Sequence, residues 1–545
     1  MENIIKGNIC CPVSKRIFYG ELHIENGIIK EIIELSSPID TFYILPGLVD
    51  AHIHIESSLL VPSEFARAAV KHGTTATVSD PHEIANVMGL TGIEFMIENG
   101  KKTPFKFNFG ASSCVPATNF ETAGATITTK DIDNLLQRND IKYLSEMMNY
   151  PGVIFEFPDV LEKLKIAQKY GKPIDGHSPG LRGKDAQKYI SMGISTDHEC
   201  YKLDEALEKI SYGMKIIIRE GTAAKNFEEL HPILTSHPDM CMFCSDDKHP
   251  DDLLIGHINK IMARAIAIGH DFFNVLRAAT YNPIKHYNLN SGLLQVGDPA
   301  DFIVVKDLKD FDVVSTAIDG NYVYNNGKVL IDPIPIEPIN NFNCSKKKPE
   351  DFKIYSKQNK VTVNVIEAIE GQLITNKLIA DLDVKNGEII PDIENDILKI
   401  TVVNRYKDNP PAVAFIKNFG LKQGAIASSV GHDSHNIIAV GTNDEDLANA
   451  VNLIIENKGG LSLANKDERD ILPLPVAGLM STDDVVNVGK KYSNLYQRAR
   501  QLGSGLHSVY MTASFMALLV IPSIKLSDLG LFNGEKFEFI NLINS

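Results

Sequence analysis

The strongest constraint on the fold is a regular alternation of short apolar stretches with helical ones in the first half of the chain. Eight stretches have the length and composition of buried strands. They span residues 45–56, 74–80, 105–109, 143–146, 173–177, 193–198, 214–219 and 240–246. Amphipathic helical patterns lie between most of them, as at 63–72, 84–99, 160–170 and 203–211. Such alternation predicts an α/β fold with a (β/α)₈ TIM-like barrel, and a doubly wound open sheet is the alternative.

Polar residues stand at the ends of five of these strands. They are His52 and His54 on the first strand, Glu146 on the fourth, His177 on the fifth, His198 on the sixth and Asp246 on the eighth. Each has a structural explanation, either a hydrogen-bonded core histidine or an acidic helix cap. A barrel, however, gathers the carboxyl ends of its strands at one face, where active sites lie. Their joint placement therefore predicts one site.

The first strand shows what kind of site this is. Side chains alternate along a strand, so His52 and His54 share one face while Ala51 and Ile53 share the other. Two imidazoles on one face can bind the same cation, and neutral imidazole suits zinc, iron and other transition ions. The pattern indicates a metal centre, with a half-buried structural strand as the alternative.

The sequence around the barrel predicts three further segments. Residues 1–46 and 288–335 have the turns and strands of a small β-domain, a β-sandwich built from both sides of the 47–287 barrel. A proline-rich linker follows, and 350–545 reads as an α/β or α+β accessory domain. Within it, 431–436 carries His432 and His435; a surface loop before a strand explains them, and a second metal site is the alternative.

Composition excludes several classes of protein. A net charge of −15 would repel nucleic acid and anionic membranes, and it suits a small neutral or cationic substrate. The N-terminus lacks a secretory pattern and the apolar run 515–521 is too short to span a bilayer, so we expect a cytoplasmic protein. Seven irregularly spaced cysteines do not form a disulfide framework. Cys241 and Cys244 lie on opposite strand faces, which favours packing over zinc binding.

Several longer motifs resemble a known family. Pro46-Gly47-Leu48-Val49-Asp50-Ala51-His52-Ile53-His54 is similar to the first-strand signature of the amidohydrolase superfamily. More specific pieces resemble the adenine deaminase family of that superfamily, and the similarity covers nearly the whole chain. They include Asp80-Pro81-His82-Glu83-Ile84, Glu146-Met147-Met148-Asn149-Tyr150-Pro151-Gly152, Asp175-Gly176-His177-Ser178-Pro179-Gly180, Arg219-Glu220-Gly221-Thr222-Ala223 and Asp433-Ser434-His435-Asn436.

The resemblance implies hydrolysis of adenine to hypoxanthine and ammonia at a centre of two divalent ions, manganese or iron, with zinc an alternative. We expect the protein to act on a small-molecule substrate and to form a homo-oligomer. We expect it to bind neither nucleic acid nor membranes. The implied ligands are His52, His54, Glu146, His177, His198 and Asp246, with Glu146 bridging the ions. A bound divalent ion would lower the pKa of water towards about 7 and so provide hydroxide at neutral pH.

The remaining roles follow from the chemistry of attack at C6 of a purine. Asp246 is placed to move the proton of the attacking water to the leaving ammonia. A second acid should protonate the purine ring, and Glu83 and Glu199 are both candidates. Arg219 and Glu220 end the seventh strand and could recognise the base edge, while an ion pair explains them equally well.

Two rival functions make different demands on the sequence. An amino-sugar deacetylase of the same superfamily would use one metal and a phosphate-binding pocket, and no clear phosphate loop is present. A barrel that serves only as a binding protein should have lost some ligands, whereas all six are here. The sequence therefore favours the deaminase.

Overall fold

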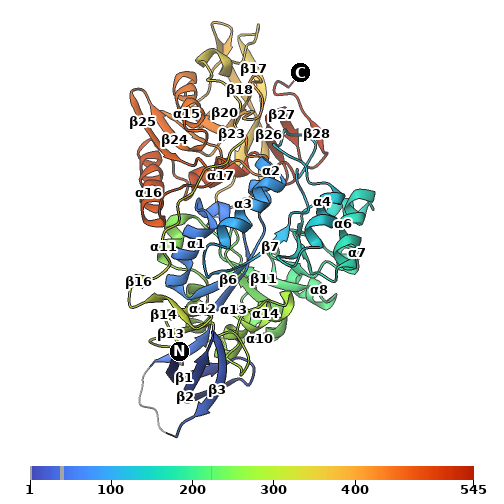
Figure 1. Cartoon of the computed structure of the whole chain (residues 1–545). Helices are drawn as coiled ribbons and strands as arrows, with labels where there is room; N and C mark the ends of the chain where they lie inside the picture. The colour runs from blue at the N-terminus through green and yellow to red at the C-terminus, as the bar shows by residue number, and fades with distance from the viewer. Residues whose placement is uncertain (1–2, 37–41, 223, 545) are drawn as a thin grey trace.

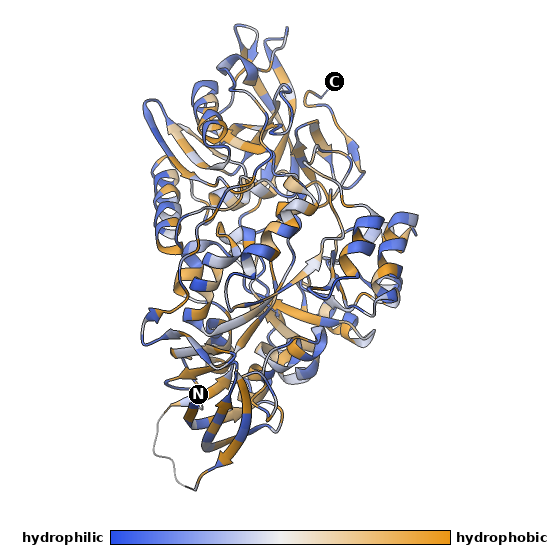
Figure 2. Cartoon of the chain, in the orientation of Figure 1, coloured by the Kyte–Doolittle hydropathy of each residue, from blue (hydrophilic) through white to orange (hydrophobic). Residues whose placement is uncertain are grey.

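The computed structural model describes residues 3–36, 42–222 and 224–544. Figure 1 shows three parts stacked along one axis: a sheet near the N-terminus, a central barrel and a C-terminal domain at the opposite end. Figure 2 shows hydrophobic and hydrophilic residues alternating along surface helices such as α6 and α16, as expected for helices that bury one face. Within the described residues, no helix is long and apolar enough to cross a membrane.

The central part is a barrel of eight parallel strands. They are β5 (Leu48–Ile53), β6 (Thr74–Ser79), β7 (Lys106–Ala111), β8 (Ile141–Met147), β9 (Ile174–Gly176), β10 (Thr196–Asp197), β11 (Lys215–Arg219) and β12 (Cys241–Cys244). β5 to β9 pair in order, as do β10 to β12. The Ser195 amide donates to Ile174 O at 2.9 Å and the Asp246 amide to His52 O at 3.0 Å, which joins the two runs at both seams. The predicted barrel is confirmed and the open sheet is wrong.

Helices surround these strands. They are α1 (Pro62–Ala69), α2 (His82–Met88), α3 (Leu90–Gly100), α4 (Thr129–Leu136), α5 (Tyr150–Ile154), α6 (Pro158–Lys169), α7 (Gly183–Ser191), α8 (Leu203–Ser211), α9 (Phe227–Leu230), α10 (Ile233–Ser236), α11 (Pro250–Ile255), α12 (Ile258–Ala267), α13 (Phe272–Ala279) and α14 (Tyr281–Tyr287). The predicted single helix over 84–99 is two helices. Gly89 separates them with φ of 61°, a left-handed value that glycine adopts readily.

The N-terminal sheet is built from both sides of the barrel, as predicted. Its strands are β1 (Asn3–Cys11), β2 (Arg16–Glu25), β3 (Ile28–Glu34), β4 (Tyr43–Pro46), β13 (Phe302–Val305), β14 (Val313–Ile318), β15 (Asn321–Asn325) and β16 (Lys328–Val329). β4 is the junction, because it pairs with β1 on one edge and with β13 on the other. Hydrogen bonds connect all eight strands into one continuous sheet, which leads directly into β5.

The C-terminal domain is α+β. A nine-stranded sheet contains β17 (Lys360–Ala368), β18 (Thr375–Lys385), β19 (Glu388–Ile389), β20 (Ile397–Val403), β21 (Ala412–Lys417), β22 (Ala425–Ser428), β23 (Ile437–Gly441), β24 (Gly460–Asn465) and β25 (Glu468–Pro473). A second sheet contains β26 (Ile524–Ser527), β27 (Gly530–Asn533) and β28 (Glu538–Phe539), and the helices are α15 (Asp444–Asn457), α16 (Val485–Gln501) and α17 (Val509–Phe515). Most strand pairs are antiparallel, which decides between the two predicted classes.

The C-terminal domain is docked on the barrel beside the carboxyl ends of its strands. The Ser481 amide donates to Leu59 O at 2.8 Å, just past β5. His249 Nδ1 lies 2.6 Å from the Tyr492 hydroxyl, and the Asn436 side chain donates to Thr122 O at 2.8 Å. The barrel face that is predicted to carry the chemistry is therefore covered by the C-terminal domain.

Candidate metal centre and active-site cleft

The first group of candidate ligands comes from the ends of β5 and β12. His52 Nε2 and His54 Nε2 lie 3.2 Å apart, and Asp246 Oδ1 lies 3.6 Å from the first and 3.3 Å from the second. All three side chains are buried. Strand alternation directs both imidazoles inward, while Ile53 packs in the apolar core. Three nitrogen and oxygen donors therefore point at one small volume.

The second group forms around Glu146 at the end of β8. Glu146 Oε2 lies 2.8 Å from His177 Nδ1 and 3.2 Å from His198 Nε2. Its other oxygen, Oε1, lies 3.4 Å from His54 Nε2 in the first group. The structure thus brings all six predicted ligand residues together, and Glu146 is the carboxylate that touches both groups.

The arrangement fits a divalent metal. The Nδ1 atoms of His52 and His198 are buried without a hydrogen-bond partner among the described residues. Two imidazole nitrogens that face each other at 3.2 Å cannot both carry a proton, so at least one of them presents a lone pair there. Convergent imidazole and carboxylate donors are the set that transition ions prefer.

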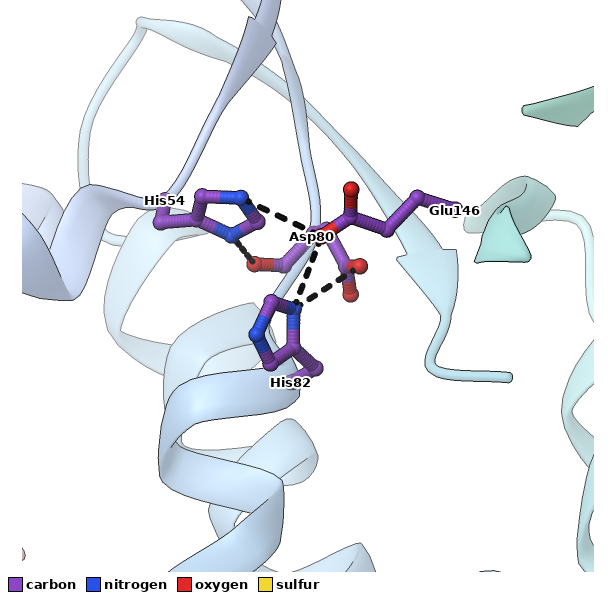
Figure 3. A group of neighbouring side chains, drawn as sticks. All are labelled: His54, Asp80, His82 and Glu146. Atoms are coloured by element: carbon purple, nitrogen blue, oxygen red, sulfur yellow. Dashed lines mark hydrogen bonds and ion pairs between the residues drawn. The ribbon is translucent and has the colours of Figure 1, made fainter. Parts of the chain in front are cut away.

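Two residues next to this centre were not predicted as site residues. Figure 3 shows Asp80, which follows β6, and His82, which begins α2, turned toward His54 and Glu146. His82 Nδ1 lies 3.1 Å from Asp80 Oδ2 and 3.5 Å from Glu146 Oε1, and His54 Nδ1 lies 3.2 Å from Asp80 O. Active-site residues of a barrel follow the carboxyl ends of its strands, and the end of β6 is one of these positions. The sequence therefore contained the information needed to predict Asp80 and His82.

Arg219 and Glu220 lie on opposite faces of the chain at the end of β11. Arg219 Nη1 donates to Asp246 Oδ2 at 2.8 Å, and its Nη2 donates to Glu199 Oε2 at 3.2 Å. Two buried carboxylates therefore engage this guanidinium. Glu220 accepts from Arg264 Nη1 at 2.8 Å and does not reach the ligand cluster. The predicted base-binding role of Glu220 does not fit this position, and the ion-pair alternative does.

Glu83 contacts the C-terminal domain. Its Oε1 lies 2.8 Å from His432 Nε2, and its Oε2 pairs with His435 Nε2. His432 Nδ1 in turn lies 2.5 Å from the Ser514 hydroxyl. His432 and His435 are both buried, so the segment that we expected to be a surface loop is an interior one. The contacts of His432 and His435 with Glu83 cross the interface between the barrel and the C-terminal domain.

One cleft between the barrel and the C-terminal domain is lined by most of these residues, among them His54, Glu146, His177, His198, Asp246, Glu83, Glu199 and Arg219. The barrel supplies the polar floor, and the C-terminal domain supplies an apolar wall of Leu373, Phe515, Leu518 and Val520. Asp247, His432 and Asp433 also face the cleft. A polar floor under an apolar wall suits a small planar heterocycle. Ala223, the last residue of the Arg219 motif, lies outside the described residues.

Lys525 supports the apolar wall from behind. The side chain is fully buried, and its Nζ donates to Phe515 O at 2.9 Å and to Leu373 O at 2.5 Å. Burial lowers the pKa of Lys525 to about 7, whereas an unfolded lysine titrates near 10.4. Between these pH values the unfolded chain binds more protons, so stability should rise with pH.

We therefore expect the stability of the natural protein to increase by about 2 kcal/mol relative to Lys525→Met between pH 7 and pH 9. Methionine matches the length of the lysine but does not titrate, so it isolates the contribution of the amine. Urea unfolding of both proteins at the two pH values measures the difference. Parallel pH dependence in the two proteins would show that Lys525 is not the titrating group.

Comparisons with known proteins agree with this geometry. Residues 43–323 match the amidohydrolase family, and residues 372–538 match the adenine deaminase C-terminal domain. Adenine deaminase from Methanosarcina mazei is 53% identical, with 98% of each chain covered. The adenine deaminases from Sulfurovum sp. and Borreliella burgdorferi are 54% and 51% identical over 98% of this chain and 99% of theirs.

Solved structures are also similar to part of the chain. A beta-aspartyl dipeptidase from Fervidobacterium islandicum covers 60% of this chain and 97% of its own, with a TM-score of 0.46 and 16% identity. An N-acetylglucosamine-6-phosphate deacetylase from Pasteurella multocida covers 60% of this chain and 100% of its own, with a TM-score of 0.45 and 14% identity.

Proposed function

Because this chain belongs to the adenine deaminase family of amidohydrolases, we propose that it hydrolyses adenine to hypoxanthine and ammonia. The observation that carries the proposal is the cleft itself. Six buried candidate metal ligands from five strand ends lie beneath a wall supplied by the adenine deaminase C-terminal domain. The family implies a divalent metal, and the donor set fits one.

We assign two ions to this centre, manganese or iron, with zinc as the alternative. His52, His54 and Asp246 would hold one, His177 and His198 the other, and Glu146 would bridge them. One observation supports this division: Glu146 presents Oε1 to His54 and Oε2 to His177 and His198. When bound, the ions supply a nucleophile by lowering the pKa of water.

The chain's own residues then handle protons and orientation. Asp246 takes a proton from the attacking water and passes it to the departing amine, which requires a carboxylate held close and ionised. Burial opposes ionisation of Asp246, but the Arg219 guanidinium outweighs it and holds the pKa well below its usual range. Arg219 is thus a positioning residue for Asp246 and Glu199. The apolar wall excludes water and packs against the purine plane.

The deacetylase alternative meets a difficulty at the same place. Among the described residues that line the cleft, Arg219 is the only arginine or lysine, and two carboxylates already engage it. A phosphate on an amino sugar would need unpaired cationic or amide donors. The observed wall offers apolar side chains instead, which favours an uncharged base.

Metal analysis combined with ammonia release tests the proposal. Protein loaded with manganese or iron should release ammonia from adenine, and it should leave cytosine and N-acetylglucosamine 6-phosphate unchanged. Dialysis against a chelator should abolish the activity, and added manganese should restore it. Turnover of another compound on this panel, with adenine untouched by fully loaded protein, would overturn the assignment.

A further inference from the structure

Deamination of adenine needs a group that protonates the ring, and the two carboxyls predicted for this role are poorly suited to it. Attack at C6 moves an electron pair onto N1, which must take a proton. Glu199 is engaged by Arg219, through Nη1 to one oxygen and through Nη2 to the other at 3.2 Å. One guanidinium therefore occupies both oxygens of Glu199 with charge-assisted hydrogen bonds.

Glu83 is held in the same way by the C-terminal domain. His432 Nε2 approaches one of its oxygens at 2.8 Å, and His435 Nε2 approaches the other. Burial opposes ionisation of Glu83, but the two imidazoles outweigh it and hold the pKa well below its usual range. Burial also lowers the pKa of His432, but Glu83 outweighs it and raises the value to about 9. Glu83 is therefore an anion that anchors the cleft.

Asp433 is in a different situation. It lines the same cleft and is only 3% exposed, yet it forms no ion pair with any residue that the structure describes. Its Oδ2 is buried without a hydrogen-bond partner. The charged groups that face it are His82 and Glu83 on α2, His432 in its own segment, Glu146 on β8 and Glu121. Burial raises the pKa of Asp433 above its usual value, which favours the neutral acid.

We propose that Asp433 is a catalytic residue: the acid that hydrogen-bonds N1 of adenine and protonates it as water adds to C6. This inference rests on the proposed function. Its basis is the contrast in ion pairing among the three carboxyls. Arg219 engages Glu199, and His432 and His435 engage Glu83, whereas Asp433 forms no ion pair with a described residue. The C-terminal domain then supplies chemistry as well as an apolar wall.

The protons balance in this scheme. The C6–O bond forms while the C6–N1 π pair moves to N1, and the N1–H bond forms as the carboxyl O–H bond of Asp433 breaks. Asp246 carries one proton of the water to the amine, and ammonia leaves as the C6–N bond breaks. The second proton of the water returns to Asp433. The products are hypoxanthine, with its N1–H, and ammonia.

A binding comparison tests the N1 contact without turnover. 6-Methylpurine has no leaving amine, and its 1-deaza analogue replaces N1 with C–H. Isothermal titration calorimetry on metal-loaded natural protein should show about tenfold tighter binding of 6-methylpurine, the value of one good hydrogen bond. Asp433→Ala should remove that preference. Equal affinities in the natural protein, or an unchanged preference in the variant, would overturn the proposal.

Kinetics on Asp433→Asn test the proton transfer. The amide keeps the shape and a hydrogen-bond donor but gives up no proton, so kcat for adenine should fall about 10²- to 10³-fold while KM changes little. Metal content should equal that of the natural protein. An unchanged kcat in the fully metal-loaded variant would refute the acid role of Asp433 but not the proposed function. Inactivity of the natural protein on adenine would refute the proposed function.

Discussion

Replacing Glu146 with glutamine should lower both the metal content and the activity of this protein, with kcat/KM for adenine falling about 10³-fold. Glu146 contacts both ligand groups, with Oε1 3.4 Å from His54 and Oε2 2.8 Å from His177. An amide carries no charge, and its NH₂ group would replace one of these two carboxylate oxygens. Elemental analysis and ammonia release, on proteins prepared in the same manganese concentration, measure the two effects.

Thermal unfolding provides the control for this substitution. Metal that binds only the folded state raises the melting temperature, so the natural protein should gain stability when manganese is added. The Glu146→Gln protein should gain much less, while the two metal-free proteins should melt at similar temperatures. Full metal content together with undiminished activity would remove Glu146 from the bridging position.

Local patterns were sufficient to predict the barrel and the polar residues that gather at one of its faces. The strand alternation that aims His52 and His54 inward needs no tertiary information, and neither does the rule that active-site residues follow parallel strands. Helix boundaries were less accessible. The 84–99 pattern reads as one helix because an isolated glycine is tolerated in a helical sequence. In the folded protein Gly89 has φ of 61° and divides it, so that α2 is a short helix that begins with His82 and Glu83.

The C-terminal half of the site could not be predicted from local sequence. His432, Asp433 and His435 lie in a polar segment before a strand, which normally indicates a surface loop. They are buried because the C-terminal domain docks on the barrel, and their partners come from both sides of that interface: Glu83 from α2 and Ser514 from α17. No periodicity in either segment encodes such a contact. Cleft-lining groups such as Asp433 therefore become visible only in the assembled fold.

Arg219 and Glu220 are neighbours in the sequence, but their side chains point to opposite sides of the chain and have different partners. Both were candidates for binding the base edge, because both end the seventh strand. The pleat directs Arg219 to Asp246 and Glu199, and directs Glu220 to Arg264 at 2.8 Å. Arg219 is only 6% exposed, whereas the Arg264 side chain that pairs with Glu220 is 38% exposed. Substitutions at these neighbouring positions should therefore have very different effects.

Arg219→Met should reduce kcat/KM for adenine roughly 10²- to 5 × 10³-fold, because it leaves two buried carboxylates without their cation. Removing one partner of a buried pair costs about 3–5 kcal/mol, which corresponds to a rate effect of that size if the cost falls on the active form. Glu220→Gln is the matched control: its ion pair is partly solvated and worth about 1 kcal/mol or less, so activity should change less than about threefold. Steady-state kinetics on both variants at equal metal content measure the contrast. A larger loss in Glu220→Gln than in Arg219→Met would show that Glu220, and not Arg219, faces the reacting groups.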